Sequence, residues 1–165
     1  MTLDIEERYY ADGTLETRLY RHNGQLHHID GPAYESYFST GHLECSSWYM
    51  YGKCHRENGP ARELFNEGGV LILCEWHLNG KIHREDGPAQ ESFYGNGLSE
   101  VRVWRKHDEL HREDGPALET FLVNGQRTSV SYYLKGILLT ADEHQRQVAL
   151  LKLTAKIPHN SEVLL

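Results

Sequence analysis

The chain contains few cysteines and no long apolar run. Cys45, Cys54 and Cys74 are odd in number and form no Cys-x-x-Cys spacing, which argues against a disulfide framework and indicates free thiols in a reducing compartment. No apolar stretch is long enough to span a bilayer, and residues 1–7 lack the basic start and apolar run of a signal peptide. We therefore expect a cytosolic protein.

Basic residues are also scarce. The 165 residues include 17 Lys and Arg against 24 Asp and Glu, which gives a formal net charge of -7. Proteins that bind nucleic acid without sequence preference, or that bind anionic membranes, depend on Lys and Arg facing phosphate. This balance argues against both roles. It favours a protein partner with a basic surface.

Motifs for catalysis are missing as well. The sequence has no G-x-S-x-G nucleophile turn, no phosphate-binding G-x-x-x-x-G-K loop and no cysteine within a recognisable motif. Catalysis needs one asymmetric arrangement of groups, whereas this chain is built from nearly equal units. We expect no enzymatic activity and no cofactor.

The chain does contain a fourfold repeat. A segment of the form His-x-x-Asp/Asn-Gly-Pro-Ala begins at His27, His55, His83 and His111, and each copy lies 28 residues after the last. The same step relates three further columns: Gly13, Gly41, Gly69, Gly97 and Gly125; Glu7, Glu35, Glu63, Glu91 and Glu119; and Tyr20, Trp48, Trp76, Trp104 and Tyr132. A fixed period of this length indicates a repeat array, in which each unit buries its apolar surface against its neighbours.

Each repeat is predicted to form two strands. In the unit 89–116, alternation over 89–94 predicts a strand, Gly95-Asn96-Gly97 predicts a turn, and 99–106 predicts a second strand that carries Trp104. A tight turn follows, as at Asn79-Gly80; repeat four has His107-Asp108 there, and we expect the turn to survive because Asp tolerates the left-handed region. The pattern predicts a mainly β fold, an elongated antiparallel meander of about five 28-residue hairpins and about ten strands, partly solvated on both faces.

The array is predicted to cover residues 1–139. Thr140-Ala141-Asp142-Glu143 then fits a capping box, and a stripe with Val148 and Leu151 predicts a helix over 140–157, followed by a tail at 158–165. We expect the helix to cap the open end of the sheet. The alternative is a helix that binds a partner.

The motif W-x-x-N-G-K-x-H-R-E-D-G-P-A, present as residues 76–89, resembles the variant MORN-type repeats of bacterial, phage and giant-virus proteins. The resemblance covers residues 5 to 139, with departures at His28-Ile29, at His107-Asp108 and throughout the fifth unit. It implies a β-hairpin repeat scaffold without enzymatic activity, used for protein contacts. Some bacterial relatives are antitoxin-like, and phage copies resemble accessory genes.

The histidine and glutamate columns invite two chemical hypotheses. Equivalent side chains in adjacent repeats should lie about 9 to 10 Å apart, whereas each zinc ligand must reach within about 2.0 to 2.3 Å of the ion. We therefore expect no metal, and a structural His that donates to a carbonyl or carboxylate. The glutamate spacing matches that of inverting glycosidases, but five equivalent Glu offer no difference in environment to separate an acid from a base. We expect Glu63 and Glu91 to pair instead with Arg or His of the H-R-E-D segments, such as Arg56, Arg84 or Arg112.

Specificity should lie at positions that vary between repeats and point off the sheet. The candidate partner-binding residues are Tyr34, Tyr49, Arg62, His77, Tyr94 and Arg105, with Gln90 and Leu118 at equivalent varying positions. Tyr, Arg and His are favoured at binding hot spots; the alternative is that these side chains fill a thin core. The leading hypothesis is a binding module of a phage or mobile element that inhibits a host defence protein or a toxin. The second is a structural or assembly protein that self-associates.

Overall fold

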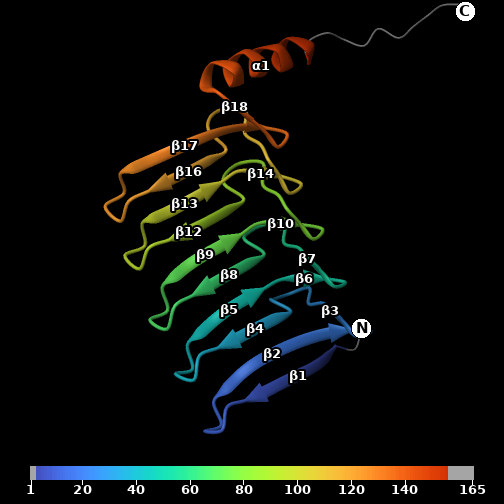
Figure 1. The fold of residues 1–165 in the computed structure, drawn as a ribbon. Helices are drawn as coiled ribbons and strands as arrows, with labels where there is room; N and C mark the ends of the chain where they lie inside the picture. Colours follow the sequence, from blue (N-terminus) through green and yellow to red (C-terminus); the bar gives the residue numbers. More distant parts are fainter. Residues whose placement is uncertain (1–2, 156–165) are drawn as a thin grey trace, which may run out of the picture.

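The chain folds into a long, open antiparallel sheet. The computed structural model describes residues 3–155. The main sheet has 12 strands, in the order β1-β2-β4-β5-β8-β9-β12-β13-β16-β17-β18, with β3 paired to β2 (Figure 1). Each neighbour follows along the chain, so the sheet is a meander that grows in one direction. The prediction of a mainly β, elongated meander is confirmed.

The strands of the main sheet are short, as expected for one repeat every 28 residues. They are β1 (Asp4–Tyr9), β2 (Leu15–His22), β3 (Gln25–Leu26), β4 (Tyr34–Tyr37), β5 (Leu43–Ser47), β8 (Arg62–Phe65), β9 (Leu71–Glu75), β12 (Gln90–Phe93), β13 (Ser99–Val103), β16 (Leu118–Phe121), β17 (Arg127–Leu134) and β18 (Ile137–Leu139). Three separate ribbons pair β6 (Tyr49–Met50) with β7 (Lys53–Cys54), β10 (His77–Leu78) with β11 (Lys81–Ile82), and β14 (Arg105–Lys106) with β15 (Glu109–Leu110).

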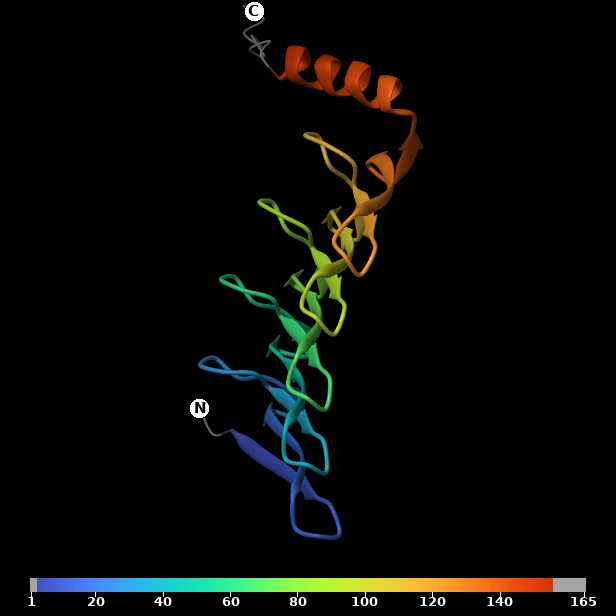
Figure 2. The same cartoon turned by 90° about the vertical axis from the view of Figure 1, so that its left-hand side faces the viewer.

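The ribbons correct one expectation. The second strand of the unit was expected to run unbroken over 99–106, but β13 ends at Val103 and the chain leaves the main sheet at Trp104. The Trp104 amide donates to the Ala117 carbonyl at 2.8 Å, and its own carbonyl accepts from the His111 amide at 3.1 Å. The next residues therefore pair with their own return strand, as β14 does with β15. Successive repeats lie one above another along the array (Figure 2).

The ribbon turns are built as the sequence predicts. Asn79 has φ of 53° and Gly80 of 87°, so both central residues lie in the left-handed region that a two-residue hairpin requires. In repeat four, His107 and Asp108 adopt φ of 52° and 75°. The expectation that this turn survives is confirmed.

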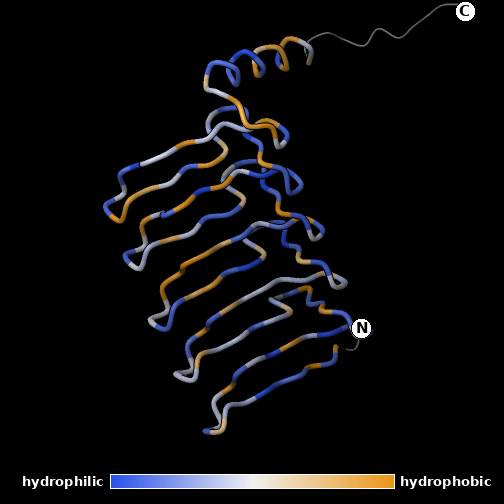
Figure 3. The backbone as a smooth tube through the Cα atoms, viewed as in Figure 1, coloured by the Kyte–Doolittle hydropathy of each residue, from blue (hydrophilic) through white to orange (hydrophobic). Residues whose placement is uncertain are grey.

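The core is thin and built on small residues. Its fully buried members are the alanines of the repeated motif, Ala33, Ala61, Ala89 and Ala117, and the one large side chain that is fully buried among the described residues is His27. Hydrophobic and hydrophilic residues are mixed along the sheet, and β9 is mostly hydrophobic (Figure 3). Hydrogen bonds between repeats therefore carry much of the organisation that a thick core would supply.

Each H-R-E-D-G-P-A loop is held by an arginine that lies on a tryptophan. The Arg84 Cζ lies 3.9 Å from the centre of the Trp76 ring, and its Nη1 donates to the Pro88 carbonyl at 3.3 Å. Arg84 Nε also donates to Asp86 at 2.7 Å. A Cβ on Gly87 would meet Arg84 Cζ at 2.8 Å, which explains the glycine of the motif.

The glutamate column is therefore paired differently from our expectation. Arg56 lies on Trp48 and Arg112 lies on Trp104 in the same way, with Cζ 4.2 and 3.9 Å from the ring centres. Glu91 instead accepts from Arg102 of the neighbouring strand at 2.7 Å. The expectation that Glu91 pairs with an H-R-E-D arginine was therefore wrong. The indole face and the proline carbonyl together hold the guanidinium of that arginine more completely than one carboxylate would.

The histidine column links successive repeats. Nδ1 of each histidine accepts a hydrogen bond from the backbone amide of a ribbon turn 24 residues further along the chain. The pairs are His27 with Tyr51 (3.3 Å), His55 with Asn79 (3.1 Å), His83 with His107 (3.3 Å) and His111 with Lys135 (3.1 Å). Nε2 faces the Glu two residues on, at 3.2 Å for His83 and Glu85. Donation to a carboxylate agrees with the expected structural role; the acceptor role of Nδ1 was not foreseen.

A helix covers the far end of the sheet. Helix α1 (Ala141–Thr154) begins after N-cap Thr140, and the predicted capping box with Glu143 is present. His144 and Val148 are buried against the array, and the His144 ring lies 5.2 Å from Tyr132. The helix lies beyond the β18 end of the array and contacts β17 and β18 (Figure 1). The end of the predicted range, 156–157, and the tail at 158–165 lie outside the described residues.

Within residues 3–155, no helix combines the length and the apolar character needed to cross a membrane.

Candidate protein-binding face

Strand register places the varying positions in one row on one face of the main sheet. Arg62 is the partner of both Ser47 and Glu75, and Gln90 is the partner of both Glu75 and Val103. The row extends to Tyr34 on one side and Leu118 on the other. Side chains that are cross-strand partners point to the same face. We call this surface the Glu75 face.

A polar network is centred on Glu75. Its carboxylate accepts from Gln90 Nε2 at 2.7 Å, and lies 3.4 Å from His77 Nε2 and 3.6 Å from Arg62 Nη1. Arg105 joins through Gln90, since its Nε donates to Gln90 Oε1 at 2.8 Å. Three strands of the main sheet and two ribbons thus contribute one side chain each to a single hydrogen-bonded group.

The network fixes the charge of Glu75. The hydrogen bond from His77 holds the pKa of this carboxyl below its ordinary value of 4.5, the one from Gln90 acts in the same direction, and burial opposes both. Glu75 is therefore ionised at neutral pH although it is only 9% exposed. His77 Nδ1 is buried and has no hydrogen-bond partner among the described residues.

Two tyrosines and two cysteines flank Arg62. Tyr49 is the cross-strand partner of Cys54, and it lies near enough to Tyr34, Cys45 and Arg62 to interact with them electrostatically. Burial raises the pKa of Tyr49 and raises the pKa of the Cys54 thiol to about 12. The thiol is therefore protonated at neutral pH and serves as a small apolar side chain.

Among the sequence-predicted residues, Arg62, His77 and Arg105 join the Glu75 network. Tyr49 lies on the Arg62 side of it, and Tyr34 lies next to Tyr49. Tyr94 does not belong to this group. It follows β12 at the turn end of its hairpin, and its hydroxyl donates to the Phe121 carbonyl of the next repeat at 2.8 Å. Tyr10 makes the same bond to Tyr37, also at 2.8 Å, so this contact belongs to the scaffold.

Sequence reasoning missed the centre of the network. Glu75 occupies a column whose other members are Leu19, Ser47, Val103 and Ser131. A single acid at a position where the other repeats have apolar or small residues departs from the repeat pattern. That departure is the sequence signal that could have identified Glu75. No other repeat has an acid at this position, so Glu75 gives this face its asymmetry.

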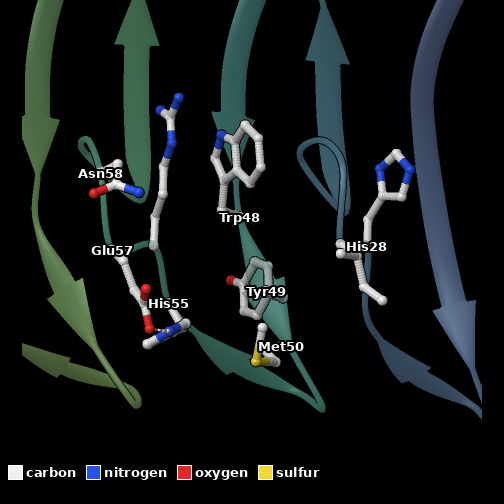
Figure 4. Close-up of a pocket in the computed structure, with 9 residues that line it drawn as sticks. His28, Trp48, Tyr49, Met50, His55, Glu57 and Asn58 are labelled. Atoms are coloured by element: carbon white, nitrogen blue, oxygen red, sulfur yellow. Dashed lines mark ion pairs between the residues drawn. The ribbon is translucent and has the colours of Figure 1, made fainter.

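Grooves between successive loops lie beside the face. One, of about 400 Å³, is lined by Trp48, Tyr49, Met50, His55 and Glu57, with neighbours from the preceding loop (Figure 4). Two further grooves of about 400 and 490 Å³ have Trp76 and Trp104 in the equivalent places. Because the groove recurs from repeat to repeat, it is a consequence of the scaffold and offers no unique site.

Within residues 3–155, no three His, Cys, Asp or Glu side chains converge closely enough to hold an ion. Comparison of the chain with models of protein families, with curated proteins and with solved structures returns no match.

Proposed function

We propose that the chain is a non-catalytic repeat scaffold that binds a protein partner through the Glu75 face. The observation that carries this proposal is the concentration of non-repeated side chains in one place. Arg62 and Arg105 belong to a network centred on Glu75, an acid that no other repeat has at this position, and Tyr49 and Tyr34 lie on the Arg62 side of it. Aromatic and arginine side chains on a rigid surface are the residue types that dominate protein interfaces.

The chemistry of the surrounding groups supports a binding role over a catalytic one. Burial raises the pKa of Cys54 to about 12 and of Cys74 to about 11, so neither provides a thiolate nucleophile at neutral pH. Glu75 is committed to three donors of its own chain. A general base needs free access to the proton that it removes.

The proposed biological role rests on the resemblance to MORN-type repeats. We place the protein in the reducing cytosol, a proposal that the three free thiols support. There it would act as a phage or mobile-element inhibitor that holds a host defence protein or a toxin. The binding role does not depend on this assignment, because it is argued from the face alone.

Affinity capture from host lysate tests the proposal. The wild type is compared with a face variant, Arg62→Glu with Arg105→Glu, and with a control variant, Arg127→Glu. Arg127 is 55% exposed and makes one ion pair with Glu119, so the control changes a similar surface charge outside the network. We expect one stoichiometric protein with the wild type and the control, and its loss with the face variant while circular dichroism stays unchanged. Equal capture by all three would refute the proposed face.

Self-association is a second candidate, favoured by one specific observation. Four large apolar side chains are about 60% exposed at the C-terminal end of the array, namely Ile137, Leu138, Leu150 and Leu153. Light scattering over a hundredfold range of concentration distinguishes the two functions. A mass that rises with concentration and falls back in a Leu150→Ser, Leu153→Ser variant would favour assembly; a constant monomer mass would oppose it.

A further inference from the structure

The Glu75 face differs in charge from the molecule as a whole. The chain carries a formal net charge of -7, which taken alone favours a basic partner. The network, however, contains two arginines, Arg62 and Arg105, and one carboxylate, Glu75. These three groups together carry one net positive charge. Glu44, a further carboxylate near this face, is bonded to the Ser36 hydroxyl at 2.9 Å.

Arg62 retains the capacity to bind a further acid. Its side chain is 45% exposed, and its one ion pair, to Glu75, is long at 3.6 Å. A guanidinium has five N–H donors in a planar fork that fits a carboxylate with two parallel bonds. The contacts with Glu75 and with the Cys45 side chain therefore leave part of this fork for a further acceptor.

Arg105 is held more firmly than Arg62. Its Nε bonds to Gln90 at 2.8 Å and its Nη1 bonds to the Asp108 carbonyl at 2.7 Å. These bonds fix the direction of the guanidinium before any partner arrives. A charge that is fixed in advance loses little conformational entropy on binding, which makes it an effective contributor to affinity.

The flanking tyrosines complete the surface. Tyr49 lies near Arg62, Tyr34 lies next to Tyr49, and both tyrosines are half-buried. Burial beside Tyr49 partly shields Arg62 from water, which strengthens its interaction with a carboxylate.

We infer that the partner presents an acidic segment to the Glu75 face, with an Asp or Glu carboxylate bound by the fork of Arg62 and a second acid near Arg105. This inference rests on the proposed function and names the partner's chemistry. Nucleic acid is the less suitable occupant, because the one net positive charge of the network would meet phosphates next to a chain of net charge -7.

Selection from a random dodecapeptide library displayed on phage tests the inference, with the immobilised full chain as target. We expect the selected peptides to be enriched in Asp and Glu. Synthetic copies of the strongest binders are then measured by fluorescence anisotropy, each beside a counterpart with Asp→Asn and Glu→Gln. Loss of one charge-assisted pair should weaken binding about tenfold.

Matched variants place the interaction on the face. Arg62→Gln with Arg105→Gln should weaken the acidic peptides about tenfold or more, since two charged contacts are lost. Arg102→Gln is the control, because Arg102 is 40% exposed, pairs with Glu91, and adjoins Val103 of the row, so it points to the opposite face. Circular dichroism and thermal unfolding check that every variant is folded.

Three results would overturn the inference: a pool enriched in Lys and Arg, no enrichment at all, or acidic peptides that bind the Arg62→Gln, Arg105→Gln variant as well as the wild type. The proposed function fails separately. The proposed binding role of the face stands if basic peptides are selected and bind a Tyr34→Ala, Tyr49→Ala variant more weakly than the wild type. It fails if the selected peptides bind the arginine variant and the tyrosine variant as well as they bind the wild type.

Discussion

Nδ1 of His111 accepts a hydrogen bond from the backbone amide of Lys135, 24 residues further along the chain, at 3.1 Å. The amide belongs to the ribbon turn of the next repeat, whose residues cannot satisfy it within the turn. The same bond recurs in the three earlier repeats. A side chain of one repeat thus fixes the turn of the next, and the stacking of ribbons depends on a neutral imidazole with its proton on Nε2.

Replacing one of these histidines should destabilise the array. His83→Ala removes the acceptor for the His107 amide, together with the stacked contact of the two rings at 4.2 Å. We expect the free energy of unfolding to fall by about 0.5–1.5 kcal/mol, the net value of one hydrogen bond, because the His107 amide is exposed and water can replace its partner. Urea unfolding measures the change. His107→Ala is the control, since it keeps the amide and loses the ring contact alone; an equal loss in both variants would assign the effect to stacking.

Stability should decline on mild acidification. Burial, with a smaller contribution from His107, lowers the pKa of His83 below its ordinary value of 6.5. As the pH falls, His83 therefore binds a proton in the unfolded chain before it does so in the folded chain. Its contribution to the free energy of unfolding is complete above about pH 7 and declines as pH falls through the pKa of the folded state. The lowered pKa values of Glu75 and Glu85 affect stability only below about pH 4.5, their ordinary pKa. The histidine and glutamate effects on stability therefore fall in separate pH ranges.

Thermal unfolding between pH 8 and pH 5 measures this decline. His83→Asn should flatten it, because an amide does not titrate in this range. A wild-type melting temperature that stays constant from pH 8 to pH 5 would contradict the neutral His83 that the structure requires.

The glycine of the repeated motif should be intolerant of a side chain. Gly87→Ala places a Cβ 2.8 Å from Arg84 Cζ, so the guanidinium must leave the Trp76 ring or the loop must shift. We expect a loss of about 1–3 kcal/mol, the range of a moderate overpacking defect. Gly95→Ala is the matched control, because no atom lies within 4 Å of its Cβ. Equal stability of the two variants in urea would show that the arginine moves without cost.

The first repeat contains a defect that one substitution should repair. His27 Nε2 is buried without a hydrogen-bond partner among the described residues, because Ile29 stands where the other repeats have Glu57, Glu85 and Glu113. Ile29 is 62% exposed, so its replacement removes little buried apolar surface. We expect Ile29→Glu to raise the free energy of unfolding by about 0.5–1.5 kcal/mol, the value of one net hydrogen bond. Ile29→Gln tests whether the charge is needed; a decrease in both variants would mean that the apolar contact matters more.

The sequence alone predicted the features that recur. The period of 28, the turns at Asn79-Gly80 and His107-Asp108, and the capping box at Thr140 are local patterns with a fixed backbone requirement, so they can be identified without a structure. Repetition strengthens each of them, because an interpretation must hold in several copies.

Features that depend on tertiary contacts were harder to foresee. The break at Trp104 is invisible in β propensity, because residues on both sides favour strands and the break depends on a bond from the His111 amide to the Trp104 carbonyl. The place of Arg84 on Trp76 depends on a ring 8 residues earlier, and no local rule favours it over Glu91. Glu75 was missed for a different reason: attention to repeated columns hides the one residue that departs from them.

The most direct test of the binding face is hydrogen exchange of the purified chain with and without its captured partner, followed by mass spectrometry. The account predicts that partner binding slows exchange over Arg62–Leu78, which covers β8, β9 and β10, and leaves β18 and α1 unchanged. Slower exchange confined to β18 and α1 would contradict the account and assign recognition to the C-terminal end of the array.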